Sequence, residues 1–128
     1  MAELRLALAH PLDAASAPLF AADLVAEAAP QGILLDYSGE SVGYLDSVVA
    51  SLRASRVTVE QVGEVLLGFG CYFGECILRS AGGEWVASTG EFPIAIRTAD
   101  GTALDPVAYA FTALVDGASF VDLYERLS

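Results

Sequence analysis

Residues 58–80 limit the folds open to this chain more than any other stretch of the sequence. Thr58-Val59-Glu60-Gln61 has the form of a capping box, in which the first and fourth residues satisfy each other's backbone at the start of a helix. Gly82-Gly83 follows at the point where a helix of this length should end. The stretch predicts one long helix over about 58–80, which would form the centre of the fold.

The side chains of this predicted helix divide into two faces at about 100° per residue. The apolar face carries Val62, Val65, Leu66, Phe69, Tyr72, Phe73, Cys76 and Ile77. The opposite face carries Glu60, Gln61, Glu64, Gly68, Cys71, Glu75 and Arg79. This division is typical of an amphipathic helix with one side in the core. We therefore expect Cys76 to be buried, and Cys71 and Glu75 to face water.

Three glycines, Gly63, Gly70 and Gly74, share a narrow flank between the two faces. Each glycine costs up to about 1 kcal/mol relative to alanine inside a helix. Their clustering indicates that another backbone, for example the sheet, approaches this flank closely.

The first half of the chain predicts a strand and two further helices. Leu4, Leu6 and Leu8 alternate as in a strand. A helix over about 16–29 carries Pro18 in its first turn, with Leu19, Phe20, Leu24 and Val25 facing inward. The apolar run 33–37 is expected to be extended, and Ser38 or Ser41 caps a helix that reaches about Ala54.

The second half predicts a β-meander over about 84–105, with Asp100-Gly101 as a two-residue hairpin turn. Asp105-Pro106 then begins a helix that ends near Gly117, and Ser119 begins a final helix. The fold class is therefore α+β, a small antiparallel sheet packed against helices in a single domain spanning 1–128. Whether the strand of residues 4–8 joins that sheet stays open.

The net charge of −11 narrows the classes of partner. Phosphate backbones and anionic lipids bind through Lys and Arg, so we expect neither nucleic acid nor membrane binding. A basic protein partner is the natural complement, although acidity also serves solubility. The most apolar run, residues 62–78, contains Glu64 and Glu75 and is shorter than a membrane span. We expect a cytoplasmic protein with free thiols.

Catalytic and metal-binding patterns are weak. Gly39-Glu40-Ser41-Val42-Gly43 matches the G-x-S-x-G nucleophile elbow, but the single histidine, His10, precedes the serine. The favoured interpretation is that Ser38 or Ser41 caps a helix and that the glycines are turn residues. Asp36, Glu40 and Asp46 are close in sequence but match no metal loop. We expect no catalytic residue, no cofactor and no metal site.

Binding residues are sought instead among aromatic and charged side chains. Glu75 is four residues before Arg79, the spacing of an ion pair on a helix. Phe92, next to the 88–91 loop, is expected to be exposed, and Trp85 or Phe92 on the surface would mark a partner site. Together with Tyr37, these give the candidate binding residues Trp85, Phe92, Glu75 and Tyr37.

The run Gly70-Cys71-Tyr72-Phe73-Gly74-Glu75, followed by Gly82-Gly83-Glu84-Trp85, resembles a G-x-Y-x-G-E…G-G-x-W pattern of small, uncharacterised bacterial α+β domains. The resemblance covers about residues 33–123 and implies no activity. Some similar acidic proteins are immunity proteins that neutralise toxins.

Three functional hypotheses follow from these observations. The first is a non-catalytic, acidic interaction protein, of an immunity or accessory type, that binds a basic protein. The second is a small-ligand binder or hydrolase that uses the Ser41 and Glu75 region. The third is a structural subunit of an oligomer.

Overall fold

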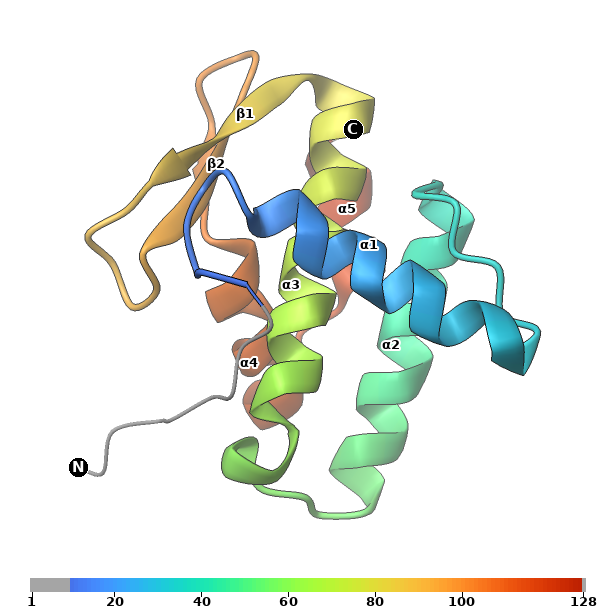
Figure 1. Ribbon diagram of the computed structural model, residues 1–128. Helices are drawn as coiled ribbons and strands as arrows, with labels where there is room; N and C mark the ends of the chain where they lie inside the picture. The colour runs from blue at the N-terminus through green and yellow to red at the C-terminus, as the bar shows by residue number, and fades with distance from the viewer. Residues whose placement is uncertain (1–9, 128) are drawn as a thin grey trace.

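The computed structural model describes residues 10–127, which form an α+β fold with a helical majority and one small sheet (Figure 1). The predicted strand of residues 4–8 lies outside the described residues. The elements in chain order are α1 (Ala17–Ala28), a short 3-10 turn η1 (Ala29–Gln31), α2 (Gly39–Ala54), α3 (Val59–Ala81), β1 (Gly83–Ala87), β2 (Ile94–Thr98), β3 (Ala103–Leu104), α4 (Pro106–Asp116) and α5 (Phe120–Leu127).

Helix α3 begins and ends close to where the sequence predicts. The Thr58 amide donates to Gln61 Oε1 over 2.8 Å, and the Gln61 amide donates to Thr58 Oγ1 over 3.3 Å, so the capping box is confirmed. Gly82 ends the helix with φ of 77°, a backbone conformation that favours glycine. The helix runs through the middle of the molecule, and α1 crosses it (Figure 1).

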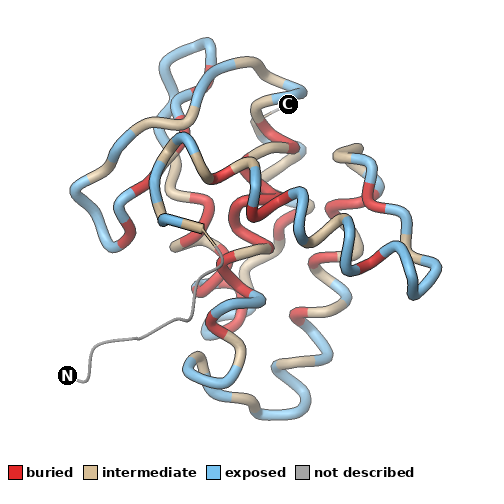
Figure 2. The backbone as a smooth tube through the Cα atoms, in the orientation of Figure 1, coloured by how far each residue is buried: buried red, intermediate tan, exposed pale blue. Residues whose placement is uncertain are grey.

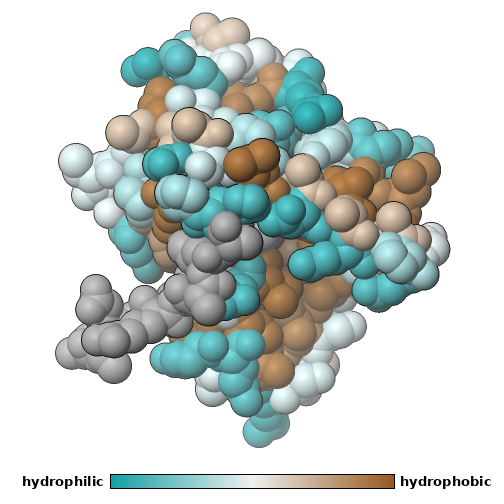
Figure 3. Space-filling view, in the orientation of Figure 1, coloured by the Kyte–Doolittle hydropathy of each residue, from teal (hydrophilic) through white to brown (hydrophobic). Residues whose placement is uncertain are grey.

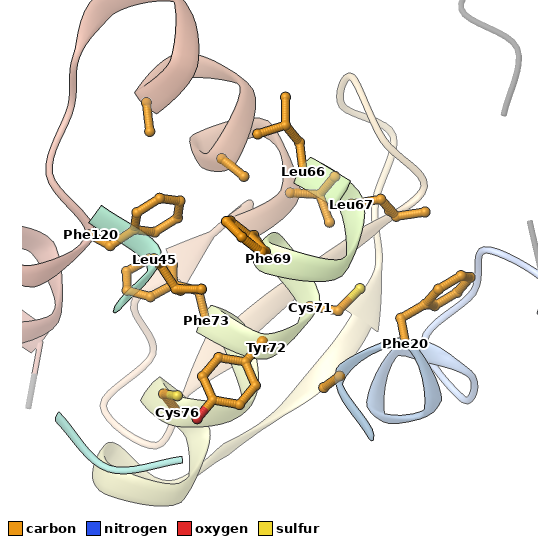
Figure 4. Close-up of a cluster of buried hydrophobic side chains, with 14 of the residues drawn as sticks. Phe20, Leu45, Leu66, Leu67, Phe69, Cys71, Tyr72, Phe73, Cys76 and Phe120 are labelled. Carbon is orange, nitrogen blue, oxygen red and sulfur yellow. The ribbon is translucent and has the colours of Figure 1, made fainter. Parts of the chain in front are cut away.

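The predicted two-faced character of α3 is wrong over its central turns. Cys71, assigned to the water-facing side, is 0% exposed, and Leu67 is buried as well. Conversely, Val65 is 44% exposed although it was assigned to the core. The physical reason is that α1, α4 and the sheet pack around α3 from several directions, as the buried stretch in Figure 2 shows. Figure 4 places Cys71 on the side of α3 that faces Phe20 of α1.

The glycine flank of α3 is a close seam with α4 and with the Trp85 ring. A Cβ at Gly70 would lie 2.5 Å from Val107 Cα, and one at Gly74 would lie 2.4 Å from the Trp85 ring. A close backbone approach is therefore confirmed at Gly70, although the approaching backbone belongs to the start of α4 rather than to the sheet. At Gly74 a side chain takes the space.

The sheet has the order β1-β2-β3 with antiparallel pairing. Arg97 pairs with Ala103, and the Thr98 amide donates to the Thr102 carbonyl, which leaves three residues, 99–101, in the turn. The predicted two-residue hairpin at Asp100-Gly101 is therefore one residue too short. Gly101 has φ of 90°, as three-residue hairpins with glycine in the left-handed position require.

The remaining helices begin at the predicted caps. Ser38 caps α2 by accepting from the Ser41 amide, and Asp105 caps α4 by accepting from the Ala108 amide. In α1, Phe20 is buried as predicted, whereas Leu19 is 48% exposed, so its inward assignment is wrong. Within residues 10–127, no helix combines the length and the apolar character needed to cross a bilayer.

Candidate functional site

Residues 33–38 are a segment outside helix and strand, with a bend at 37–38, that connects η1 to α2 and lies against α3. The Tyr37 amide donates to the Tyr72 hydroxyl over 2.8 Å, and the two rings stack with centroids 4.9 Å apart. Tyr37 has φ of 65°, which is uncommon for a residue with a bulky side chain. The contacts with Tyr72 therefore hold a strained residue in place and fix the path of the segment.

Ser41, the candidate nucleophile of the G-x-S-x-G pattern, is a structural residue in the first turn of α2. Its hydroxyl donates to the Ser38 carbonyl over 2.6 Å and accepts from the Tyr72 hydroxyl over 2.7 Å. Ser41 is 6% exposed. His10 lies elsewhere, hydrogen-bonded to Asp23 of α1 over 2.7 Å. The hydroxyl of Ser41 therefore has a backbone carbonyl, not a histidine, as its proton acceptor.

Arg79 of α3 forms the next contact with the 33–38 segment and pairs with Glu75 of the same helix. The Arg79 guanidinium lies 3.7 Å from the centre of the Tyr37 ring, on which it stacks as a cation on an aromatic face. Its Nη2 is 3.4 Å from Glu75 Oε1, so the ion pair predicted from the spacing is confirmed. The Glu75 side chain is only 12% exposed, however, and its expected position facing water is wrong.

Trp85 explains the burial of Glu75. The indole Nε1 donates to Glu75 Oε2 over 2.8 Å, while the ring covers Gly74. The structure thus brings together three of the four candidate binding residues, Tyr37, Glu75 and Trp85, with Arg79 joining them. Each oxygen of the Glu75 carboxylate has a partner, and the Arg79 guanidinium lies on the Tyr37 ring, so the cluster forms a clamp between α3, β1 and the 33–38 segment.

Phe92, the fourth candidate, lies outside this cluster and is buried. It is 9% exposed and packs on Phe111 of α4 with ring centroids 5.1 Å apart. The expected exposure of Phe92 is therefore wrong, whereas Thr89, Gly90 and Glu91 of the preceding loop are exposed as expected. No sequence pattern indicated that Phe111 of α4 would cover the Phe92 ring.

Both cysteines are buried thiols. Burial raises the pKa of Cys71 and of Cys76 to about 12; the charge of Glu75 adds to this at Cys71, whereas hydrogen bonds with Ser41 and Tyr72 oppose it at Cys76. Both thiols are therefore neutral near pH 7, and thiolate chemistry is suppressed. Burial also raises the pKa of the Tyr72 hydroxyl to about 12, so Tyr72 stays a hydrogen-bond donor to Ser41.

The carboxylates at 36, 40 and 46 do not converge on a cation. Asp46 accepts hydrogen bonds from the Ser119 hydroxyl and from the Phe120 and Val121 amides, and so holds the start of α5. Across residues 10–127, no group of three or more His, Cys, Asp or Glu side chains is placed to hold a metal ion.

A pocket of about 340 Å³ lies beside the clamp, where the 33–38 segment meets α2. Its lining residues are Ile33, Leu34, Leu35, Asp36, Ser38, Glu40, Ser41 and Tyr44. Leu34 is 82% exposed, although it has the same apolar character as the buried Leu35 beside it. The right-hand side of Figure 3, where α1 connects to α2 in Figure 1, shows apolar surface next to hydrophilic surface.

The sequence reasoning missed this pocket, because it treated 33–37 only as a lead-in to a helix. One signal was available. Successive side chains of an extended chain point in opposite directions, so Ile33, Leu34 and Leu35 cannot all enter one core.

The stretch of sequence that contains the pocket residues is rich in acidic side chains. Asp13, Asp23, Glu27, Asp36 and Glu40 are all exposed, and residues 6–52 contain no Lys or Arg. All six basic residues of the chain are arginines, and five of them follow this stretch. This stretch therefore presents exposed carboxylates without Lys or Arg of its own, although His10 pairs with Asp23 and Arg79 of α3 lies against Tyr37.

Comparison of the chain with protein-family models, with curated proteins and with solved structures gives no match in any of the three.

Proposed function

We propose that this protein is a non-catalytic, acidic interaction protein that binds a basic protein partner through its first half. The observation that carries the proposal is the run of exposed carboxylates from Asp13 to Glu40 in a stretch without Lys or Arg. Interspersed charges of both signs would serve solubility equally well, whereas a one-signed region attracts an oppositely charged partner and speeds the encounter.

The chemistry of the described residues supports a binding role. The two thiols are held neutral by burial, and the hydroxyl of Ser41 is used to connect α2 to Tyr72. Glu75 is engaged by Trp85 and Arg79. These nucleophilic and acidic groups serve the fold. Among the large apolar side chains of the described residues, Leu34 is one of the most exposed, and exposed carboxylates lie on either side of it in the sequence. An immunity-type protein that neutralises a basic toxin is one form that such a binder takes.

A capture experiment with a matched charge control tests this function. The triple variant Glu27→Gln, Asp36→Asn and Glu40→Gln removes three exposed carboxylates from the acidic half. The control Glu91→Gln, Asp116→Asn and Glu125→Gln removes three exposed carboxylates from the rest of the chain. The two variants carry the same net charge, so any difference between them reports on the position of the charges.

The wild-type protein is immobilised on a resin and exposed to an extract of its own cells. It should retain basic proteins, and raising the salt concentration should elute them. The acidic-half variant should lose them, and the control variant should keep them. Retention of acidic proteins only, or equal retention by the two variants, would contradict the proposal.

A further inference from the structure

The pocket between the 33–38 segment and α2 has a composition that neither solubility nor core packing explains. Its apolar wall includes Leu34, which is 82% exposed, and Tyr44, which is partly buried. Its rim carries two exposed carboxylates, Asp36 and Glu40. A pocket with an aliphatic and aromatic wall and an anionic rim complements a side chain that is apolar along its stem and cationic at its end.

We infer that this pocket receives an arginine side chain of the basic partner, an inference that rests on the proposed function. The methylene stem of the arginine lies against Leu34 and Tyr44, and the guanidinium reaches the carboxylates of Asp36 and Glu40. Arginine fits better than lysine, because its planar group binds carboxylates through two hydrogen bonds and stacks on aromatic rings.

The charges around the pocket favour a cation. The start of α2 contributes a partial positive charge of about half a unit, which the two full carboxylate charges outweigh. Hydrogen bonds from the side chain and backbone of Ser38 lower the pKa of Asp36, so this carboxylate is ionised near neutral pH. The guanidinium of Arg79 is engaged by Glu75 and the Tyr37 ring and does not line the pocket.

The clamp gives the pocket a fixed wall before any partner arrives. Tyr37 is held by the Tyr72 hydroxyl and lies between the Tyr72 ring and the Arg79 guanidinium, so its neighbours Asp36 and Ser38 are fixed as well. A wall that is ordered in the free protein lowers the entropic cost of binding.

Three peptides of equal length test the inference: hexaarginine amide, hexalysine amide and hexacitrulline amide. Citrulline keeps the shape of arginine without its charge. Each peptide is titrated into the ¹⁵N-labelled full chain, and amide shifts are recorded. Hexaarginine should shift the amides of residues 33–44 most strongly and bind more tightly than hexalysine, and hexacitrulline should not bind.

Single variants then locate the arginine. Leu34→Ser should weaken hexaarginine binding by about tenfold, because an exposed leucine that becomes buried on binding is worth about that much. The matched control is Val115→Ser, which removes an apolar side chain that is 63% exposed on α4 and should leave binding unchanged. Glu40→Gln should weaken binding by up to about fivefold, in proportion to one exposed ion pair.

The possible outcomes distinguish a failure of the arginine-pocket inference from a failure of the proposed function. Equal binding of hexaarginine and hexalysine, with shifts spread over the acidic half and no effect of Leu34→Ser, would overturn the arginine pocket and leave the basic-partner proposal intact. Absence of binding by all three peptides would also overturn the pocket. The capture experiment with the two triple variants decides on the function separately.

Discussion

Two regions that contact the same helix show two kinds of surface. On one side of α3, Gly70 and Gly74 admit the start of α4 and the Trp85 ring so closely that no Cβ fits without displacing a neighbour. On another side, Tyr72 holds the 33–38 segment by one hydrogen bond and a stacked ring, and a pocket with the exposed Leu34 remains beside it. Packing explains the residues of the first region. It does not explain Leu34, and so the second region is where a partner is sought.

The largest expected effect comes from a substitution at Gly70, where α3 packs closely against the start of α4. Gly70→Ala places a methyl group 2.5 Å from Val107 Cα, and backbone cannot move aside cheaply. We expect the free energy of unfolding to fall by about 3 kcal/mol, at the upper end for overpacking, measured by urea denaturation. The control is Gly68→Ala in the same helix, where no atom lies within 4 Å of the added Cβ, and it should stabilise by up to about 1 kcal/mol. Equal stability of the two variants would contradict a closed seam.

The second effect uses pH to compare the thiols of α3 in the folded and unfolded chain. Burial raises the pKa of Cys71 and Cys76 from 9.0 to about 12. Above pH 9 the unfolded chain loses these protons while the folded chain keeps them, so ionisation favours unfolding. The free energy of unfolding should therefore fall as the pH rises through 9 toward 12, and the contribution of the thiols to this fall should vanish about one pH unit below 9.

Urea denaturation at several pH values measures this dependence. The double variant Cys71→Ala and Cys76→Ala should show a shallower fall, and the part that remains belongs to other buried acids such as Tyr72, whose pKa rises from 10.0 to about 12. An unchanged slope in the double variant would show that the thiols are not the cause.

The sequence predicted the element types well because local chemistry determines them. The capping box at Thr58, the cap at Asp105 with Pro106 after it, and the glycine at 101 each act within a few residues, and all three lie where their chemistry requires. The interpretation of the faces of α3 failed for a physical reason. A helical wheel assumes one wet side, whereas a helix at the centre of a small fold is covered from several sides.

In the candidate site, too, the contacts between residues close in sequence were predicted and those between distant residues were not. The i, i+4 spacing predicted the pair of Glu75 with Arg79, but the hydrogen bond from Trp85 and the stacking on Tyr37 join residues far apart in sequence. The pocket depends on where the 33–38 segment rests against α3, and that position is set by Tyr72, more than thirty residues away. No local pattern encodes such a contact.

The third prediction concerns the contact between Tyr72 and the 33–38 segment. Tyr72→Phe removes the hydroxyl that accepts from the Tyr37 amide and donates to Ser41, and should lower the free energy of unfolding by about 1–2 kcal/mol. Amide hydrogen exchange at residues 36–38 should quicken. The control Tyr44→Phe removes a hydroxyl for which residues 10–127 supply no hydrogen-bond partner, and should change neither quantity. Unchanged exchange in Tyr72→Phe would mean that the segment is held by something other than this bond.

The smallest expected effect sharpens the comparison most. Leu34→Ser should change the free energy of unfolding by less than about 0.5 kcal/mol, because a side chain that is 82% exposed contributes little to the core. Leu35→Ser, at the neighbouring buried position, should cost several times more, since Leu35 is 3% exposed. Thermal unfolding of the two variants measures this difference at adjacent residues of one segment. A loss above 1 kcal/mol for Leu34→Ser would make Leu34 part of the fold, and the pocket would then lose its claim to a partner.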